Sequence, residues 1–166
     1  MNPQPERPQV FISYARQDGE AFARDLRDRL SAAGIVLWRD REGMEGGRDW
    51  WLQITAAIDH VGFLVLVITE AALKSELVRR EWRYARQQGV TVYPVQAASG
   101  IDFSTLPRWM RSAHFYDLDY EWSKFVSDLL TDYDRVREAL DAVTQMDEFT
   151  PLLLPVGDGL LVATRA

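Results

Sequence analysis

The sequence predicts an α/β domain with a four- to five-stranded parallel sheet covered by helices on both faces, a flavodoxin-like three-layer sandwich. Apolar runs typical of strands alternate along the chain with segments whose apolar residues recur at helical spacing. The run 63–68 has no polar alternation, as expected of a central parallel strand that is buried on both faces. With four or five strands, the expected strand order is 2-1-3-4-5.

The first half of the chain predicts two strands and two helices. A strand over 10–14 leads into a helix that Gly34 ends, as glycine often does after a C-cap. A second strand follows over 35–38. The charged, glycine-rich segment 39–49 predicts a loop without regular structure, and the next helix begins at Trp50 with one apolar face.

The second half continues the alternation after the third strand at 63–68. The next helix begins with Ser75 as its N-cap and ends at Gly89. A fourth strand, a short edge strand and a last helix are expected over 91–95, 114–118 and 122–142.

The two ends of the chain differ in sequence pattern from the predicted domain at 9–142. Residues 1–8 contain three prolines and several polar groups, which predicts a disordered lead-in. Residues 143–166 predict a linker or the start of a further module, because two apolar stretches flank a Val-Gly-Asp turn sequence. A hairpin packed on the domain is the alternative, and we favour the front part of a longer protein.

Composition narrows the classes of function. The 166 residues are 47% hydrophobic and 27% charged, which is ordinary for a globular domain. A net charge of −6 argues against nucleic acid as the main partner. The absence of cysteine excludes disulfides and thiolate chemistry, and the two histidines are far apart, so we expect no metal site. No apolar run is long enough to cross a bilayer, so we expect a cytoplasmic location and no membrane contact.

Four sequence blocks stand in a recognisable order. They are 10–16 (Val-Phe-Ile-Ser-Tyr-Ala-Arg), 38–40 with 47–50 (Trp-Arg-Asp and Gly-Arg-Asp-Trp), the segment from Ser75 to Glu81, and 93–95 (Tyr-Pro-Val). In this order and spacing the chain resembles a TIR domain of the bacterial kind, over about residues 9–135. The family often has a proline before the glycine where Gly46 stands here, and Trp-Cys where Leu77 and Val78 stand.

The resemblance implies that the domain cleaves NAD between nicotinamide and ribose. Glu81 matches the catalytic glutamate of the family. Its implied role is to bind the ribose hydroxyls and to stabilise positive charge at the anomeric carbon in an oxocarbenium-like transition state. NAD is then the substrate, and no further cofactor is expected.

The end of the first strand supplies three candidate NAD-binding residues. Arg16 suits a diphosphate because its guanidinium is forked, although a surface arginine is an equal alternative. Ser13 is expected to contact the ligand or to cap the following turn, and Tyr14 lies beside it.

Four further candidates come from later segments. Trp50 can stack on a base or belong to the core, and Asp40 can anchor the loop or touch the substrate. Gly47 lies in the stretch 44–49, which we expect to act as a mobile lid, and Ser75 begins the helix that carries the catalytic glutamate.

Two functions remain open at this point. The first is an NAD-cleaving effector, the killing arm of a bacterial antiphage protein, which the resemblance implies is activated when protomers self-associate and is joined to a sensor module. The product is ADP-ribose or a cyclised isomer. The second is a non-catalytic interaction module that docks on its own kind.

Overall fold

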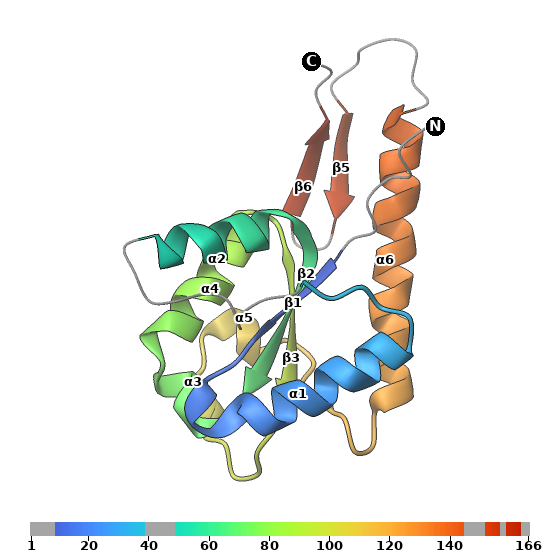
Figure 1. The fold of residues 1–166 in the computed structure, drawn as a ribbon. Coiled ribbons are helices and arrows are strands. Elements are labelled where there is room, and N and C mark those ends of the chain that lie inside the picture. Colours follow the sequence, from blue (N-terminus) through green and yellow to red (C-terminus); the bar gives the residue numbers. More distant parts are fainter. Residues whose placement is uncertain (1–8, 39–48, 145–151, 157–158, 164–166) are drawn as a thin grey trace.

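The computed structural model describes residues 9–38, 49–144, 152–156 and 159–163 (Figure 1). Its centre is a parallel sheet in the order β1-β2-β3-β4, which confirms the predicted α/β class. The strands are β1 Gln9–Ser13, β2 Val61–Ile68, β3 Thr91–Gln96 and β4 Tyr116–Asp117.

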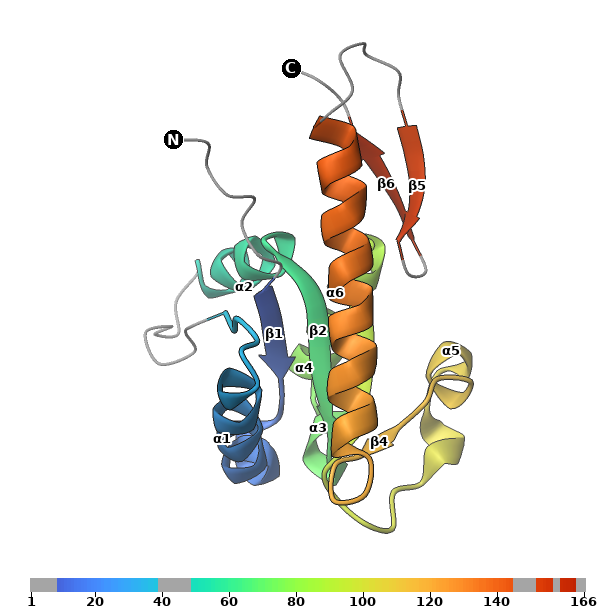
Figure 2. The ribbon, with the colours of Figure 1, turned by 90° about the vertical axis from the view of Figure 1, so that its right-hand side faces the viewer.

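Helices cover both faces of this sheet, as predicted. The helical elements are α1 Arg16–Ala32, α2 Trp50–Asp59, α3 Glu70–Lys74, α4 Glu76–Gln87, η1 Phe103–Thr105, α5 Arg108–Arg111 and α6 Trp122–Thr144. Helices α1 and α6 pack on one face, and α2, α4 and α5 pack on the other (Figures 1 and 2).

The apolar strand β2 explains why helices cover both faces of the sheet. Side chains of a strand alternate between the two faces of the sheet. Accordingly Phe63 and Val65 belong to the core beneath α1 and α6, whereas Leu64 and Leu66 belong to the core beneath α2 and α4. All four are almost completely buried. A strand that is apolar on both faces therefore requires the two outer layers.

The second predicted strand is much shorter than expected. Residue Leu37 forms a single parallel bridge with Val10, with hydrogen bonds from Val10 N to Val36 O (3.0 Å) and from Trp38 N to Val10 O (2.9 Å). Among the residues that the structure describes, only this short stretch pairs with β1 on that side. The bridge nevertheless places Leu37 on the far side of β1 from β2, as the predicted strand order requires.

The helix ends follow the expected glycines and caps. Gly34 and Gly89 adopt φ values of 80° and 76°, the left-handed conformation that favours glycine after a helix. Ser75 Oγ accepts a hydrogen bond from Val78 N at 3.2 Å and caps α4, as predicted. Helix α3 was not predicted; Thr69 Oγ1 begins it by accepting from Ala72 N at 3.1 Å.

Two tyrosines connect the sheet to α6. The Tyr93 hydroxyl on β3 donates to Asp132, and the Tyr116 hydroxyl on β4 donates to Asp128 Oδ2 at 2.7 Å. Burial and then the hydrogen bond to Asp132 raise the pKa of Tyr93 far above its usual value. The hydroxyl therefore remains a protonated donor over the whole physiological range of pH.

The C-terminal segment forms an antiparallel hairpin of β5 Leu152–Val156 and β6 Gly159–Ala163. The hairpin lies beside the C-terminal half of α6, and β5 contacts that helix (Figures 1 and 2). Of the two predicted possibilities, the hairpin is observed, and its assignment to a further module stays a prediction. The expected lead-in at 1–8 lies outside the described residues.

We expect two leucine substitutions to separate core packing from surface composition. Leu26 on α1 is completely buried, so Leu26→Ala should lower the free energy of unfolding by about 2–5 kcal/mol. Leu52 on α2 is 64% exposed, and Leu52→Ala should change it by less than about 0.5 kcal/mol. Urea unfolding followed by circular dichroism measures both. Equal losses would contradict the packing described above.

Candidate functional site

A pocket of about 750 Å³ opens at the carboxyl ends of β1 and β2. On one side of β1 lies the bridged segment at Leu37, and on the other side lies β2. The chain therefore leaves β1 in opposite directions for its two neighbours, which makes this edge the topological switch point of the sheet. Open α/β sheets bind ligands at such a point, outside the carboxyl ends of their strands.

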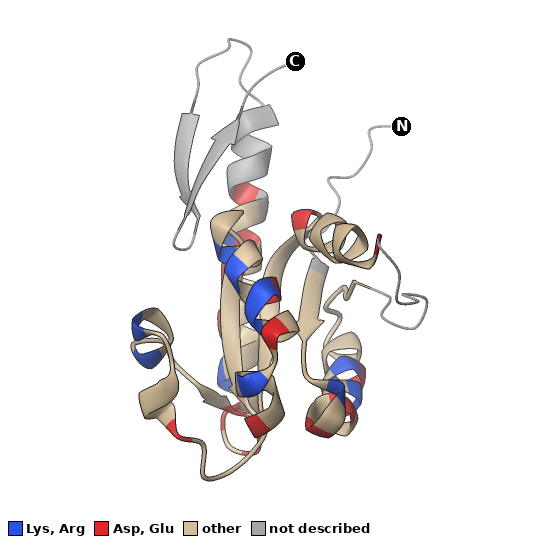
Figure 3. Cartoon of the chain, turned by 90° about the vertical axis from the view of Figure 1, so that its left-hand side faces the viewer, with Lys and Arg blue, Asp and Glu red and all other residues tan. Residues whose placement is uncertain are grey.

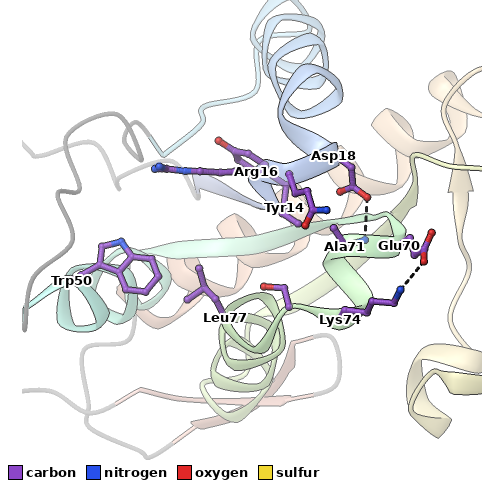
Figure 4. Close-up of a pocket in the computed structure, with 11 residues that line it drawn as sticks. Tyr14, Arg16, Asp18, Trp50, Glu70, Ala71, Lys74 and Leu77 are labelled. Atoms are coloured by element: carbon purple, nitrogen blue, oxygen red, sulfur yellow. Dashed lines mark hydrogen bonds and ion pairs between the residues drawn. The ribbon is translucent and has the colours of Figure 1, made fainter.

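Three parts of the chain line the pocket (Figure 4). One wall is the turn from β1 into α1, and the opposite wall is formed by α3 and the start of α4. Trp50, at the start of α2, lies at one end of the pocket. In this order the lining residues are Tyr14, Ala15, Arg16, Gln17 and Asp18; Glu70, Ala71, Lys74, Ser75 and Leu77; and Trp50.

Asp18 joins the two walls. Its carboxylate accepts a hydrogen bond from Thr69 Oγ1 at 2.6 Å. It accepts a second one from Ala71 N at 3.0 Å (Figure 4). Thr69 is the cap residue of α3, so one carboxylate on α1 fixes the beginning of the helix across the pocket. On the same wall, Lys74 Nζ lies 2.6 Å from Glu70 Oε1 in an exposed pair.

Glu81 is a completely buried carboxylate on α4, with an exposed fraction of 0%. It lies on the packing face of the helix together with Val78 and Ala85, three residues before it and four after it. The Ser13 hydroxyl at the end of β1 donates a hydrogen bond to Glu81 Oε2. A solvated surface glutamate, the ordinary alternative for such a residue, is therefore excluded.

The meeting of Ser13 and Glu81 follows from the geometry of both elements. Ser13 lies two residues after Phe11, so it points to the same face of the sheet, where α4 packs. Helical side chains lean toward the helix N-terminus, which directs Glu81 toward the pocket end of α4. Neither side chain is among the pocket-lining residues that the structure describes, although Tyr14 and Leu77 beside them are.

The structure brings together four of the predicted ligand contacts. Tyr14, Arg16, Trp50 and Ser75 all line the pocket. Arg16 extends from the start of α1 toward the side on which Trp50 lies (Figure 4). Ser13 lies behind the wall with Glu81, and the other two candidates, Asp40 and Gly47, lie outside the described residues, as does the predicted lid.

Sequence reasoning missed the acidic and apolar parts of the wall. Asp18 carried a usable signal, because it falls in the first turn of a helix that directly follows a strand end. Lys74 gave no such signal, since its place in the pocket depends on α3, a five-residue helix that the apolar pattern does not reveal. Leu77 lies in the first turn of α4, two residues after the predicted N-cap Ser75, but it was not predicted to line the pocket.

Helix α4 carries several arginines, which colour much of its length blue in Figure 3. Arg80 and Arg83 are exposed to solvent, and several guanidinium groups of the helix also stack on tryptophans. Arg80 lies 4.0 Å from the ring centre of Trp51, and Arg86 lies 4.1 Å from that of Trp109. Such cation–π contacts anchor the arginines on the domain.

Two further features are absent from the part of the chain that the structure describes. No helix there has the length and apolar character needed to cross a membrane. No three acidic or histidine side chains gather there in a way that would hold a metal ion.

Comparison with known proteins gives a consistent picture. The family model of the TIR domain matches residues 10–130. The NAD(+) hydrolase TcpC of Escherichia coli O6:H1 strain CFT073 is 25% identical over 71 residues, which is 43% of this chain and 23% of that protein. The matched region thus spans less than a quarter of the length of this curated relative.

Solved structures show the same fold. The TIR domain of the Toll-related receptor TRR-2 from Hydra magnipapillata superimposes with a TM-score of 0.60 at 18% identity, covering 75% of this chain and 97% of that one. A metazoan TIR-STING receptor from C. gigas in complex with 2′,3′-cGAMP gives 0.56 at 25% identity, covering 76% and 40%. The family match extends over most of the chain, and the chain belongs to the TIR domain family.

Proposed function

We propose that this TIR domain cleaves NAD at the bond between nicotinamide and ribose, with Glu81 as the catalytic residue. The observation that carries the proposal is the position of the Glu81 carboxylate. It is buried beside a pocket at the switch point of the sheet, where it meets the end of β1. Buried carboxylates are rare unless they are paired or functional.

One carboxylate is enough for this reaction. As the glycosidic bond breaks, its electron pair moves to the ring nitrogen, and nicotinamide leaves as a neutral pyridine without needing a proton. The ribose is left with positive charge shared between its anomeric carbon and ring oxygen, and a nearby anion stabilises that charge. Water then adds to the carbon and releases one proton, giving ADP-ribose; attack by an adenine nitrogen gives a cyclised isomer instead.

The pocket offers suitable contacts for the rest of the molecule. Its volume of about 750 Å³ lies within the range of ordinary ligand sites. Arg16 provides a guanidinium for the diphosphate, and Trp50 provides an aromatic surface on which a base can stack. Tyr14 and Ser75 add hydroxyl groups to the same wall.

The similarity to an NAD(+) hydrolase supports this assignment. We extend it to the whole protein as a cytoplasmic effector of bacterial antiphage defence, in which a sensor module brings TIR domains together and thereby activates them. The alternative is a non-catalytic module that serves TIR–TIR contacts. Its support is that the structural relatives include receptor domains.

Removing the carboxylate should abolish cleavage. We expect Glu81→Gln to lower the rate of nicotinamide release at least ~100-fold, because it keeps the shape of the side chain but removes the charge that the transition state needs. Chromatography of NAD and nicotinamide after incubation with concentrated protein measures the rate.

Glu76→Gln is the matched control for this experiment. The Glu76 carboxylate lies on the same helix, is exposed, and pairs with Arg79 at 3.0 Å. Its removal should leave the rate of nicotinamide release unchanged. A wild-type protein that releases no nicotinamide, even when it is clustered artificially, would instead favour the interaction module.

Arg16 should contribute mainly to binding. We expect Arg16→Ala to raise KM for NAD about tenfold with a smaller effect on kcat, because a diphosphate contact is made equally in the ground and transition states. Arg24→Ala, two turns further along α1 and exposed, is the control and should leave both constants unchanged. A fall in kcat at constant KM would contradict the binding role.

Activation by self-association predicts a dependence on protein concentration. If neighbouring protomers complete the active state, activity per mole of protein should rise as the concentration rises, by mass action. Initial rates over a ~100-fold range of concentration, with light scattering on the same samples, measure this. Constant activity per mole in a protein that stays monomeric would rule out this mode of activation.

A further inference from the structure

We propose that Ser13 is a positioning residue whose hydroxyl holds the Glu81 carboxylate behind the pocket wall, in a retracted state that has to be released before the carboxylate can reach NAD. This inference rests on the proposed role of Glu81 and adds a control point to it. The starting observation is that both side chains have an exposed fraction of 0% and are joined by a hydrogen bond.

The neighbours of the pair define how far the carboxylate is withdrawn. Tyr14 follows Ser13 directly and lines the pocket, and Leu77, one helical turn before Glu81 on the same face of α4, lines it as well. Asp18 and Glu70, the acidic residues among the described lining residues, come from other elements. Glu81 thus lies one layer below the pocket surface, adjacent to residues that an NAD molecule would touch.

The retracted state has a physical basis. A carboxylate loses its hydration when it is buried, and hydrogen bonds to the charged form compensate for part of that loss. The Ser13 hydroxyl supplies such a bond from the end of β1, a strand fixed on both sides by Leu37 and β2. Removing this donor makes the buried position of the Glu81 carboxylate less favourable. A carboxylate that faces the pocket is instead stabilised by hydration.

The expected size of the effect follows from the strength of such bonds. A hydrogen bond to a charged group shifts a two-state balance by about tenfold to a hundredfold. Ser13→Ala should therefore increase the fraction of molecules whose Glu81 faces the pocket by about tenfold or more. Ser13→Thr keeps the hydroxyl and should behave as the wild-type protein does.

Chemical labelling of carboxylates tests this position without relying on activity. The folded protein is treated with a water-soluble carbodiimide and glycine ethyl ester, and mass spectrometry measures the rate at each carboxylate. In the wild type, Glu81 should react far more slowly than the exposed Glu76 on the same helix. In Ser13→Ala, labelling of Glu81 should be about tenfold faster, and in Ser13→Thr it should remain slow.

Tyr93→Phe is the matched control for the loss of a buried hydroxyl. It removes a donor on another strand, β3, from a carboxylate on another helix, Asp132 of α6, on the opposite face of the sheet. It should change neither the labelling of Glu81 nor the cleavage of NAD. A general loosening of the fold would instead raise Glu81 labelling in both Ser13→Ala and Tyr93→Phe, and that result would overturn the proposal.

Kinetics give a second readout. Releasing the carboxylate should raise kcat of the unstimulated domain about tenfold while KM for NAD changes less than about twofold, since Arg16 and Trp50, the proposed contacts to the diphosphate and the base, are not altered. A lower kcat in Ser13→Ala, restored in Ser13→Thr, would overturn the proposal, because the hydrogen bond would then belong to the productive geometry.

The two proposals fail in different ways. If the wild type cleaves no NAD but Glu81 is protected and Ser13→Ala exposes it, the proposed function fails and the positioning role holds. If Glu81 in the wild type reacts as fast as Glu76, the positioning role fails whatever the activity. Should Ser13→Ala not fold, Ser13→Cys replaces it: a thiol is a weak donor, so Glu81 must react faster than in Ser13→Thr for the proposal to stand.

Discussion

Strand β2 presents apolar side chains on both of its faces, and this one constraint organises the rest of the domain. Phe63 and Val65 need a cover on one side, and Leu64 and Leu66 need a cover on the other. Parallel neighbours supply the hydrogen bonds of the strand, and the crossover helices that parallel pairing requires supply both covers. All strand-to-helix turns then fall at one edge of the sheet, where the pocket opens.

The hydrogen bond between Ser13 and Glu81 is a polar contact inside the otherwise apolar layer between the sheet and α4. Val78 and Ala85 on the buried face of α4 are apolar, as a packing face should be, but Glu81 between them is not. Its burial is compatible with a stable fold because the Ser13 hydroxyl meets it at the end of β1. Polar groups kept in such a position reduce stability relative to apolar ones, which is typical of functional sites.

The wall of the pocket depends on short connecting segments more than on the sheet. Asp18 accepts hydrogen bonds from the N-cap residue Thr69 and from Ala71 in the first turn of α3, and these two bonds join the α1 and α3 sides of the pocket. The residue Gly19 next to it has Tyr14 Cβ at 3.4 Å from the position where a side chain would begin, so the first turn of α1 packs closely against the strand end. These contacts connect the elements that line the pocket, and the proposed catalytic group lies beneath them.

The sequence alone determined the α/β class and the helix ends at Ser75, Gly34 and Gly89, because these depend on local periodicity and on the conformations that single residues prefer. The strand order was expected from the number of alternating strands and helices, since open parallel sheets of this size commonly adopt it. Through a pattern of motifs the sequence also predicted a catalytic role for Glu81, which stays a prediction. The short α3, the reduction of the second strand to one bridge, and the burial of Glu81 against Ser13 were decided only by the tertiary structure. The physical reason is that each depends on contacts between residues far apart in the chain, whose energies local sequence patterns do not contain.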